Sequence, residues 1–339
     1  MKVQSFGSQM WDLSFSVRAI LSSNLNQEYW PTLKRAHEFL KASQVISNPP
    51  GEFQEKYYRH ESKGCWTFST QDHGWQVSDC TAEALLVALK FSQLPTHVVG
   101  EEIDTQRLYD AVNVVLSLQS DNGGFFAWEP RRTYEWVEKL NPLEFFEDVL
   151  IEREYVECTS SAIQSLSYFQ KLHPQHRKSE IKSSIQRGIR YVEKMQNLDG
   201  SWTGNWGNCF TYATWFAVEA LATCGKNCNN SVVVRKACQF LLTKQLPDGG
   251  WGESYLSSSK KVYTNLEGKR SHLVHTSWAL LALIAADHKD VDPTPIHQGI
   301  KFIINSQMED GDYPQEIVTK GYNHEYELDY LETFCLIGK

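Results

Sequence analysis

The sequence has no long apolar stretch and no excess of positive charge, and each absence excludes a class of protein. The longest apolar run, Trp278–Ala286, has nine residues, about half of the ~18–20 that a membrane-spanning helix needs. Lys and Arg number 33 against 41 Asp and Glu, a net charge of −8, whereas a broad nucleic-acid surface needs excess positive charge. We therefore expect no membrane span and no nucleic-acid partner. The length of the apolar runs does not show whether the chain attaches to a membrane surface.

Cysteines are present, but no pair has the spacing of a zinc finger. The eight lie at positions 65, 80, 158, 209, 224, 228, 238 and 335. Met1–Ser8 contains no apolar stretch that could act as a secretion signal, so we expect free thiols in a reducing compartment. Cys224 and Cys228 are four residues apart, which favours one face of a helix over a metal site.

Aromatic rings are abundant, with 11 Trp, 15 Tyr and 16 Phe. Rings carry a large area to bury and a negative π face, so the composition predicts an aromatic core or an aromatic-lined cavity. The hydrophobic fraction of 41% and charged fraction of 22% are those of a soluble globular chain. At 339 residues the chain corresponds to one large or two medium domains.

A unit made of a glutamine, a polar turn with glycine and an aromatic residue recurs along the chain. Copies begin at Gln119, Gln196, Gln245 and, more weakly, Gln307. Their turns are followed by Trp128, Trp202, Trp251 and Tyr313, and a stretched copy runs from Gln44 to Trp66. We expect the glutamine and the aromatic residue to fasten one pair of helices to the next, which is a structural role.

Ten segments around these units have helical periodicity and helix-end signals. They are residues 8–23, 31–44, 78–93, 103–119, 159–172, 179–196, 210–224, 231–245, 271–286 and 295–307. Strand signals are nearly absent, so the sequence predicts an all-α fold of helix pairs, either an open solenoid or an α/α toroid. A toroid would surround its cavity with the less polar helices, 8–23, 78–93, 159–172, 210–224 and 271–286. Five pairs are one fewer than a typical ring has, so we expect incomplete closure.

An acidic residue stands at the start of the 78–93 helix. Asp79-Cys80-Thr81-Ala82-Glu83 follows an aromatic-rich loop that includes Phe68 and Trp75. Serine or aspartate here commonly caps a helix, and composition alone leaves that interpretation open. The alternative is a general acid, because the helix N-terminus makes a protonated carboxyl more acidic, while burial among rings keeps it protonated at rest. These opposed effects suit proton donation.

Together with the repeats and the Asp79 motif, four further segments carry a resemblance to a known family. They are Gly7–Asp12, Tyr155–Ser160, Gly204–Tyr212 and Gly249–Ser258. The sequence resembles the oxidosqualene cyclases of the squalene cyclase superfamily from Ser5 to about Glu316. Around Trp128-Glu129-Pro130 it is more similar to plant triterpene synthases of the amyrin or lupeol kind than to the sterol-forming enzymes.

The resemblance implies an isomerase that converts 2,3-oxidosqualene to a cyclic triterpene alcohol. Asp79 matches the acid that protonates the epoxide, and Cys80 and Cys158 match the thiols that hydrogen-bond its carboxyl group. Positions that line the cavity and stabilise carbocations through their π faces are matched by Trp11, Phe68, Trp128 and Trp206. The resemblance implies neither metal nor cofactor. It implies peripheral contact with a membrane, at the cytoplasmic face of the endoplasmic reticulum or at lipid droplets.

The chain also departs from the family pattern. The family enzymes place another helical domain before the matching part, and residues 317–339 do not resemble the aromatic inner helix that closes the ring. We therefore expect one toroid domain over residues 1–316, a divergent tail over 317–339 and no family N-terminal domain. The alternative to an active cyclase is a non-catalytic, truncated fragment. A third interpretation, a prenyltransferase-like toroid, requires a zinc site, and no suitably spaced ligands lie near Asp79.

Overall fold

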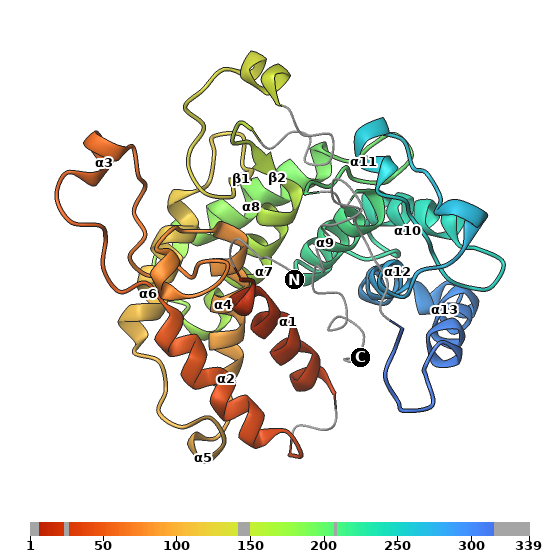
Figure 1. Cartoon of the computed structure of the whole chain (residues 1–339), viewed down its shortest axis with the longest axis horizontal. Helices are drawn as coiled ribbons and strands as arrows, with labels where there is room; N and C mark the ends of the chain where they lie inside the picture. The colour runs from red at the N-terminus through yellow and green to blue at the C-terminus, as the bar shows by residue number, and fades with distance from the viewer. Residues whose placement is uncertain (1–6, 24–26, 142–149, 207–208, 315–339) are drawn as a thin grey trace, which may run out of the picture. The chain divides into compact units, whose positions relative to one another are not determined.

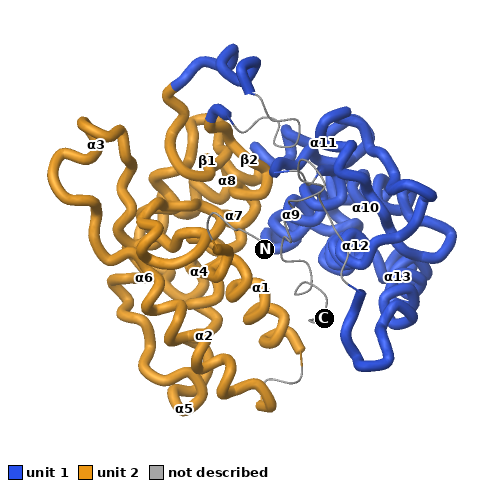
Figure 2. Tube along the Cα trace, viewed as in Figure 1, with its two compact units in different colours: residues 1–2, 133–151, 191–336 blue, residues 3–132, 152–190, 337–339 orange. Residues whose placement is uncertain are grey.

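The structure, a computed structural model, describes residues 7–23, 27–141, 150–206 and 209–314. These residues form two compact units (Figure 2). Unit 2 comprises residues 7–132 and 152–190, and unit 1 comprises residues 133–151 and 191–314.

Unit 2 contains eight α-helices and one short ribbon among its described residues (Figure 1). The helices are α1 (Gln9–Ser22), α2 (Trp30–Ser43), α3 (Phe53–Tyr57), α4 (Ser78–Phe91), α5 (Thr96–Val99), α6 (Thr105–Ser117), α7 (Val156–Leu172) and most of α8 (Lys178–Lys194). The ribbon pairs β1 (Phe125–Phe126) antiparallel with β2 (Glu154–Tyr155), with Phe125 opposite Tyr155. One 3₁₀ turn, Gln71–His73, precedes α4.

Unit 1 is built around two helices that pack against each other, α9 (Phe210–Thr223) and α12 (Leu273–Ala285). They are flanked by α10 (Val232–Lys244) and α13 (Thr294–Asn305). The short α11 (Leu256–Lys260) lies between α10 and α12 along the chain. Three 3₁₀ turns, η2 (Glu135–Leu140), η3 (Glu267–Lys269) and η4 (His288–Asp290), lie in the connections. Both units are all-α in character, and all ten expected helices are present.

Burial separates inner from outer helices as the sequence predicts, except at α1, which was expected to be an inner helix and buries four of its 14 residues. In α4, 13 of 14 residues are buried, and in α9 12 of 14 are buried. By contrast α2 buries four of 14 residues and α13 two of 12. A helix that is buried all round needs neighbours on every side, so α4 and α9 are core elements and α2 and α13 are covering elements.

The repeated glutamines fasten successive outer helices through hydrogen bonds. In each case Nε2 donates to the carbonyl of the turn glycine and to a carbonyl of the next outer helix, at 2.8–3.0 Å. The outer-helix acceptors for Gln44, Gln119, Gln196 and Gln245 are Arg107, Ser184, Val233 and Pro295. The expected structural role is confirmed. For Gln307 the bond to Gly311 is present, and the segment that follows lies outside the described residues.

The turn glycines are required by both conformation and contact. Gly64, Gly123, Gly200 and Gly249 have φ between 93° and 97°. A Cβ on any of them would lie 2.3–2.6 Å from a backbone atom of the next outer helix, at Asp110, Arg187, Lys236 and Gln298. Each contacted residue is three positions beyond the carbonyl that the glutamine binds. One turn of each outer helix therefore contacts both the glutamine side-chain amide and the turn glycine.

The aromatic residue of each unit is docked on an inner helix. Its backbone N–H donates to a threonine Oγ1, at 2.9–3.3 Å, in the pairs Trp66–Thr81, Phe125–Thr159, Trp202–Thr214 and Trp251–Thr276. The three indoles are fully buried, and each Nε1–H donates to a carbonyl of the preceding outer helix. In the second copy Phe125 takes this place, so the expectation that Trp128 belongs to the repeat is wrong.

Candidate active site

Asp79 is the second residue of α4 and is buried, with 6% of its surface exposed. The helix is preceded by Val77, which makes no side-chain capping bond, and the Ser78 N–H donates to Ala127 O at 2.7 Å. Asp79 Oδ1 accepts the N–H of Cys80 at 2.7 Å. Neither Ser78 nor Asp79 therefore occupies the N-cap position, as it would have to if its role were only to cap the helix.

Two buried thiols hydrogen-bond to the Asp79 carboxyl group. Cys80 follows it on α4, and Cys158 comes from α7, which packs against α4. Both cysteines have no exposed surface. Burial raises the pKa of both thiols well above the ordinary cysteine value, and the nearby Asp79 charge raises them further. Both groups therefore remain neutral S–H donors at physiological pH.

The repeat fixes the positions of these thiols. Thr81 and Thr159, which receive the backbone N–H groups of Trp66 and Phe125, directly follow Cys80 and Cys158. The two cysteines thus occupy the same repeat position on neighbouring inner helices, which explains how residues 78 positions apart meet at one carboxyl group.

Opposed effects set the acidity of Asp79. Burial, the largest effect, raises its pKa from 3.8 to about 6, and the negative charge of Glu83 adds to the rise. The hydrogen bonds from the Cys80 N–H and from both thiols act in the lowering direction because they stabilise the carboxylate. A carboxyl group that is partly protonated near neutral pH and has donors in place for its conjugate base is suited to general-acid chemistry.

Two further acidic residues lie near Asp79, and the sequence did not single them out. Glu83, one turn along α4, accepts from Arg18 Nη1 at 2.6 Å and from Ser161 Oγ at 2.8 Å. Glu152 accepts the Ala127 N–H at 2.7 Å, and burial raises its pKa to about 7. The four-residue spacing of Asp79 and Glu83 could have indicated a shared helix face, whereas no local pattern marks Glu152.

Trp11 and Phe68, two of the expected cavity residues, lie together. Their rings stack with centroids 5.9 Å apart and an interplanar angle of 23°. The Met10 N–H donates to Phe68 O, which joins the start of α1 to the loop before α4. Both side chains are half-buried, so each ring retains some free surface.

Trp128 is positioned through its backbone. Its carbonyl accepts from Gln76 Nε2 at 2.6 Å, beside the start of α4. The side chain is 39% exposed, unlike the buried indoles of the repeat.

Trp206 belongs to unit 1, so its position relative to Asp79 is not described. It lies before α9, has a φ of 54° and is half-buried. The start of α9 is fixed by the buried Glu253, whose two carboxylate oxygens accept the N–H groups of Phe210 and Thr211 at 3.0 and 2.8 Å. The start of α9 is therefore anchored within its own unit.

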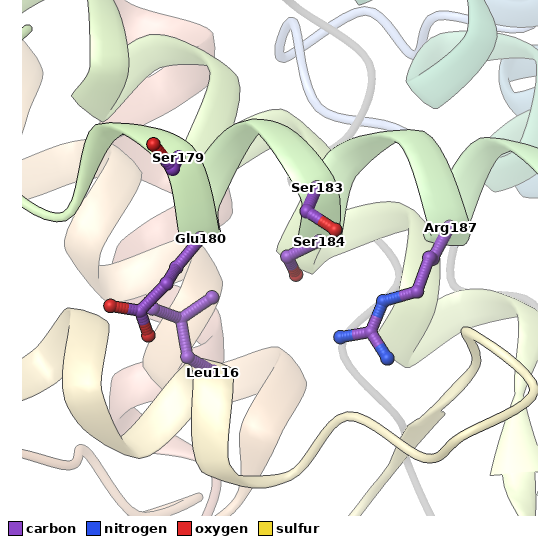
Figure 3. A pocket seen from close by; sticks show the side chains of 6 residues that line it. All are labelled: Leu116, Ser179, Glu180, Ser183, Ser184 and Arg187. Carbon is purple, nitrogen blue, oxygen red and sulfur yellow. The ribbon is translucent and has the colours of Figure 1, made fainter.

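A separate hollow of about 290 Å³ lies between α6 and α8 (Figure 3). It is lined by Leu116, Ser179, Glu180, Ser183, Ser184 and Arg187. Most of these side chains are polar or charged, and Asp79 is not among them.

The fold is that of the type II terpene cyclases. The chain is similar to the solved type II terpene cyclase MstE from Scytonema, with a TM-score of 0.60 and 16% sequence identity, over 93% of this chain and 75% of that one. At this identity the likeness concerns the fold alone.

The sequence comparisons identify the family. The family described as squalene-hopene cyclase C-terminal domain matches residues 7–336, and the chain belongs to it. The chain is 46% identical to alpha-onocerin synthase LCD of Lycopodium clavatum and 41% identical to lanosterol synthase of Homo sapiens, over 97% of this chain in both cases. It spans 43% and 45% of the lengths of these relatives, respectively.

Proposed function

We propose that the chain carries the acid of an oxidosqualene cyclase, with Asp79 as the group that protonates the epoxide of 2,3-oxidosqualene. The observation that carries the proposal is the buried Asp79 carboxyl, held by two neutral thiols and with a pKa raised to about 6. The relatives named above, synthases of onocerin and lanosterol, support the same reaction class.

The proposed first step transfers one proton. Asp79 gives its proton to the epoxide oxygen, the C–O bond breaks, and the electron pair of a neighbouring alkene forms the first ring bond. Asp79 becomes a carboxylate that the Cys80 N–H and the two thiols stabilise. The cascade ends when the last cation loses a proton, so the product is an isomer of the substrate and protons balance overall.

The aromatic residues have a second proposed role, to stabilise the cations. A desolvated cation over a ring gains roughly 0.5–2 kcal/mol, and the stacked pair of Trp11 and Phe68 offers such faces in unit 2. We assign the same role to Trp128 and Trp206 on the motif match. Dry surroundings favour the cascade because water would trap an early cation.

We also propose peripheral attachment to a membrane, because a substrate of this apolarity dissolves in lipid. The proposed location is the cytoplasmic face of the endoplasmic reticulum or the lipid droplet. None of the helices in the described ranges is long and apolar enough to cross a membrane.

A direct assay tests the proposal. The full chain in mild detergent is supplied with (3S)-2,3-oxidosqualene, and cyclic triterpene alcohols are sought by gas chromatography–mass spectrometry. Wild type and Asp72→Asn, a change at an exposed aspartate of the preceding loop, should give product, and Asp79→Asn should give none. Equal product from Asp79→Asn would refute the assignment of the acid.

The second candidate function is a fragment that does not turn over substrate alone. It is favoured by the chain's span of 43–45% of these relatives' lengths. A folded wild-type chain without product would support this alternative. Product that is restored by adding the segment that precedes the matching part in a relative, and lost again with Asp79→Asn, would show that Asp79 still serves as the acid.

A further inference from the structure

Three potential metal ligands from separate elements converge in unit 1. Cys228 lies on the loop between α9 and α10, Cys238 lies on α10, and His288 begins η4 after α12. All three are buried. The two Sγ atoms are 3.1 Å apart, Cys228 Sγ is 3.9 Å from His288 Nδ1, and the three ligand atoms lie within 4.8 Å of one another.

The surrounding bonds hold this cluster in place. The Cys228 N–H donates to Ala286 O at 2.9 Å, which ties the loop to the end of α12. Arg235 on α10 donates to Cys228 O at 2.9 Å, and Asn227 Nδ2 donates to Asp287 Oδ2 at 3.0 Å. The positions of the ligands are therefore set by independent contacts on all three elements.

No step of the proposed cyclisation uses this buried cluster. Nε2 of His288 is buried without a hydrogen-bond partner among the described residues.

We propose that Cys228, Cys238 and His288 form a binding site for Zn²⁺. Two thiolates and an imidazole are ligands that zinc prefers. Tetrahedral bonds of about 2.3 Å to sulfur and about 2.0 Å to nitrogen place the sulfurs about 3.8 Å apart and each sulfur about 3.5 Å from nitrogen. The cluster meets this geometry when the sulfurs move apart by about 0.7 Å and the imidazole nitrogen approaches to about 3.5 Å from each sulfur. Water takes the fourth position, and binding releases the thiol protons, so the two thiolates neutralise the ion.

Cobalt substitution tests the site on the full chain. The reduced protein is stripped with a chelator and titrated anaerobically with Co²⁺, whose thiolate complexes absorb in the near ultraviolet and, when tetrahedral, strongly in the visible. The expected result is saturation at about one ion per chain, reversal by Zn²⁺, and release of protons on binding.

Matched variants locate the ion. Cys228→Ser and Cys238→Ser should weaken Zn²⁺ binding by more than the 10–100-fold typical of outer-shell changes, and His288→Ala should shift the cobalt spectrum. Cys224→Ser, a change at the cysteine that ends α9 and lies outside the cluster, should retain both affinity and spectrum. Circular dichroism confirms that each variant is folded.

Three outcomes would overturn the proposal. One is wild-type protein that gives no thiolate-to-cobalt band. Another is a band that survives Cys228→Ser. The third is reduced protein that binds no ion and forms a Cys228–Cys238 disulfide on treatment with hydrogen peroxide, seen as a mass lower by two hydrogens. That last result would identify a redox-active dithiol, in which peroxide is reduced to water.

Discussion

The buried acid predicts that Asp79→Asn stabilises the protein, and does so more at high pH than at low pH. Burial raises the pKa of Asp79 from 3.8 to about 6. A carboxyl whose folded-state pKa is raised favours the folded state only while it is protonated. The cost of ionising it therefore grows as pH rises through the folded-state value. Asparagine keeps an acceptor for the Cys80 N–H and has no charge to bury.

The magnitude follows from the two pKa values. With 3.8 unfolded and about 6 folded, ionisation of Asp79 costs the native state about 1.6 kcal/mol at pH 5 and about 3 kcal/mol at pH 8. The free energy of unfolding gained on Asp79→Asn should therefore be about 1.4 kcal/mol larger at pH 8 than at pH 5. Titrating groups that do not interact with Asp79, such as Asp12, are common to both proteins and cancel in this difference. Glu152 does not cancel, because the Asp79 charge raises its pKa, and loss of that charge adds to the gain at pH 8.

Urea unfolding followed by far-ultraviolet circular dichroism at the two pH values measures the effect. Asp121→Asn, a change at an exposed aspartate in the 119–124 turn, serves as the matched control and should show a difference near zero. The reasoning fails if the Asp79→Asn gain is equal at the two pH values or larger at pH 5. Such a result would mean that Asp79 is ionised in the folded state without cost and is not held as a resting acid.

Three more predictions address catalysis and the repeat. If the chain turns over oxidosqualene, kcat/KM should be greatest below pH 6 and fall about tenfold per pH unit above it, because only protonated Asp79 donates; a rate that rises from pH 5 to 8 would exclude this acid. In the same assay Trp206→Ala should shift the products toward partially cyclised alcohols, and an unchanged product profile would count against a cation-stabilising Trp206. Gly249→Ala should cost at least about 3 kcal/mol in urea unfolding, whereas Gly268→Ala should cost about 1–2 kcal/mol. Both glycines have positive φ, but only Gly249 would place a Cβ 2.6 Å from Gln298 O, and equal costs would show that this close approach is unimportant.

The helices and the acid were predictable from local signals. Apolar periodicity and end residues placed all ten helices, with the largest error at the start of α7, which begins at Val156 instead of Thr159. The error arises because threonine reads as a cap, whereas Thr159 Oγ1 donates back to Tyr155 O one turn earlier. Asp79 was recognisable because it stands at a helix start within a family motif.

Features that depend on distant pairing were not predictable. Phe125 replaces tryptophan in the second copy of the repeat, and only its bond to Thr159, 34 residues away, reveals the register. Cys224 and Cys228 were expected to share one face of a helix, yet Cys228 lies on the loop after α9 and meets Cys238 on α10 and His288 beyond α12. Tertiary packing determines these contacts, and the spacing of residues in the sequence does not predict that packing.

The docked aromatic residues connect the fold to the acid. On α4 and α7 the residue before the docked threonine is Cys80 or Cys158, and on α9 and α12 the same position is Ala213 or His275. His275 there accepts the Glu253 N–H through Nδ1, so one repeat position can hold a thiol donor or an imidazole acceptor. The threonine bond does not involve Asp79, so it can hold each thiol in register while the carboxyl gains and loses its proton. The free-energy cost of burying the acid therefore does not weaken the contacts that build the helix pairs. Loss of the acid is expected to leave the positions of both thiols unchanged.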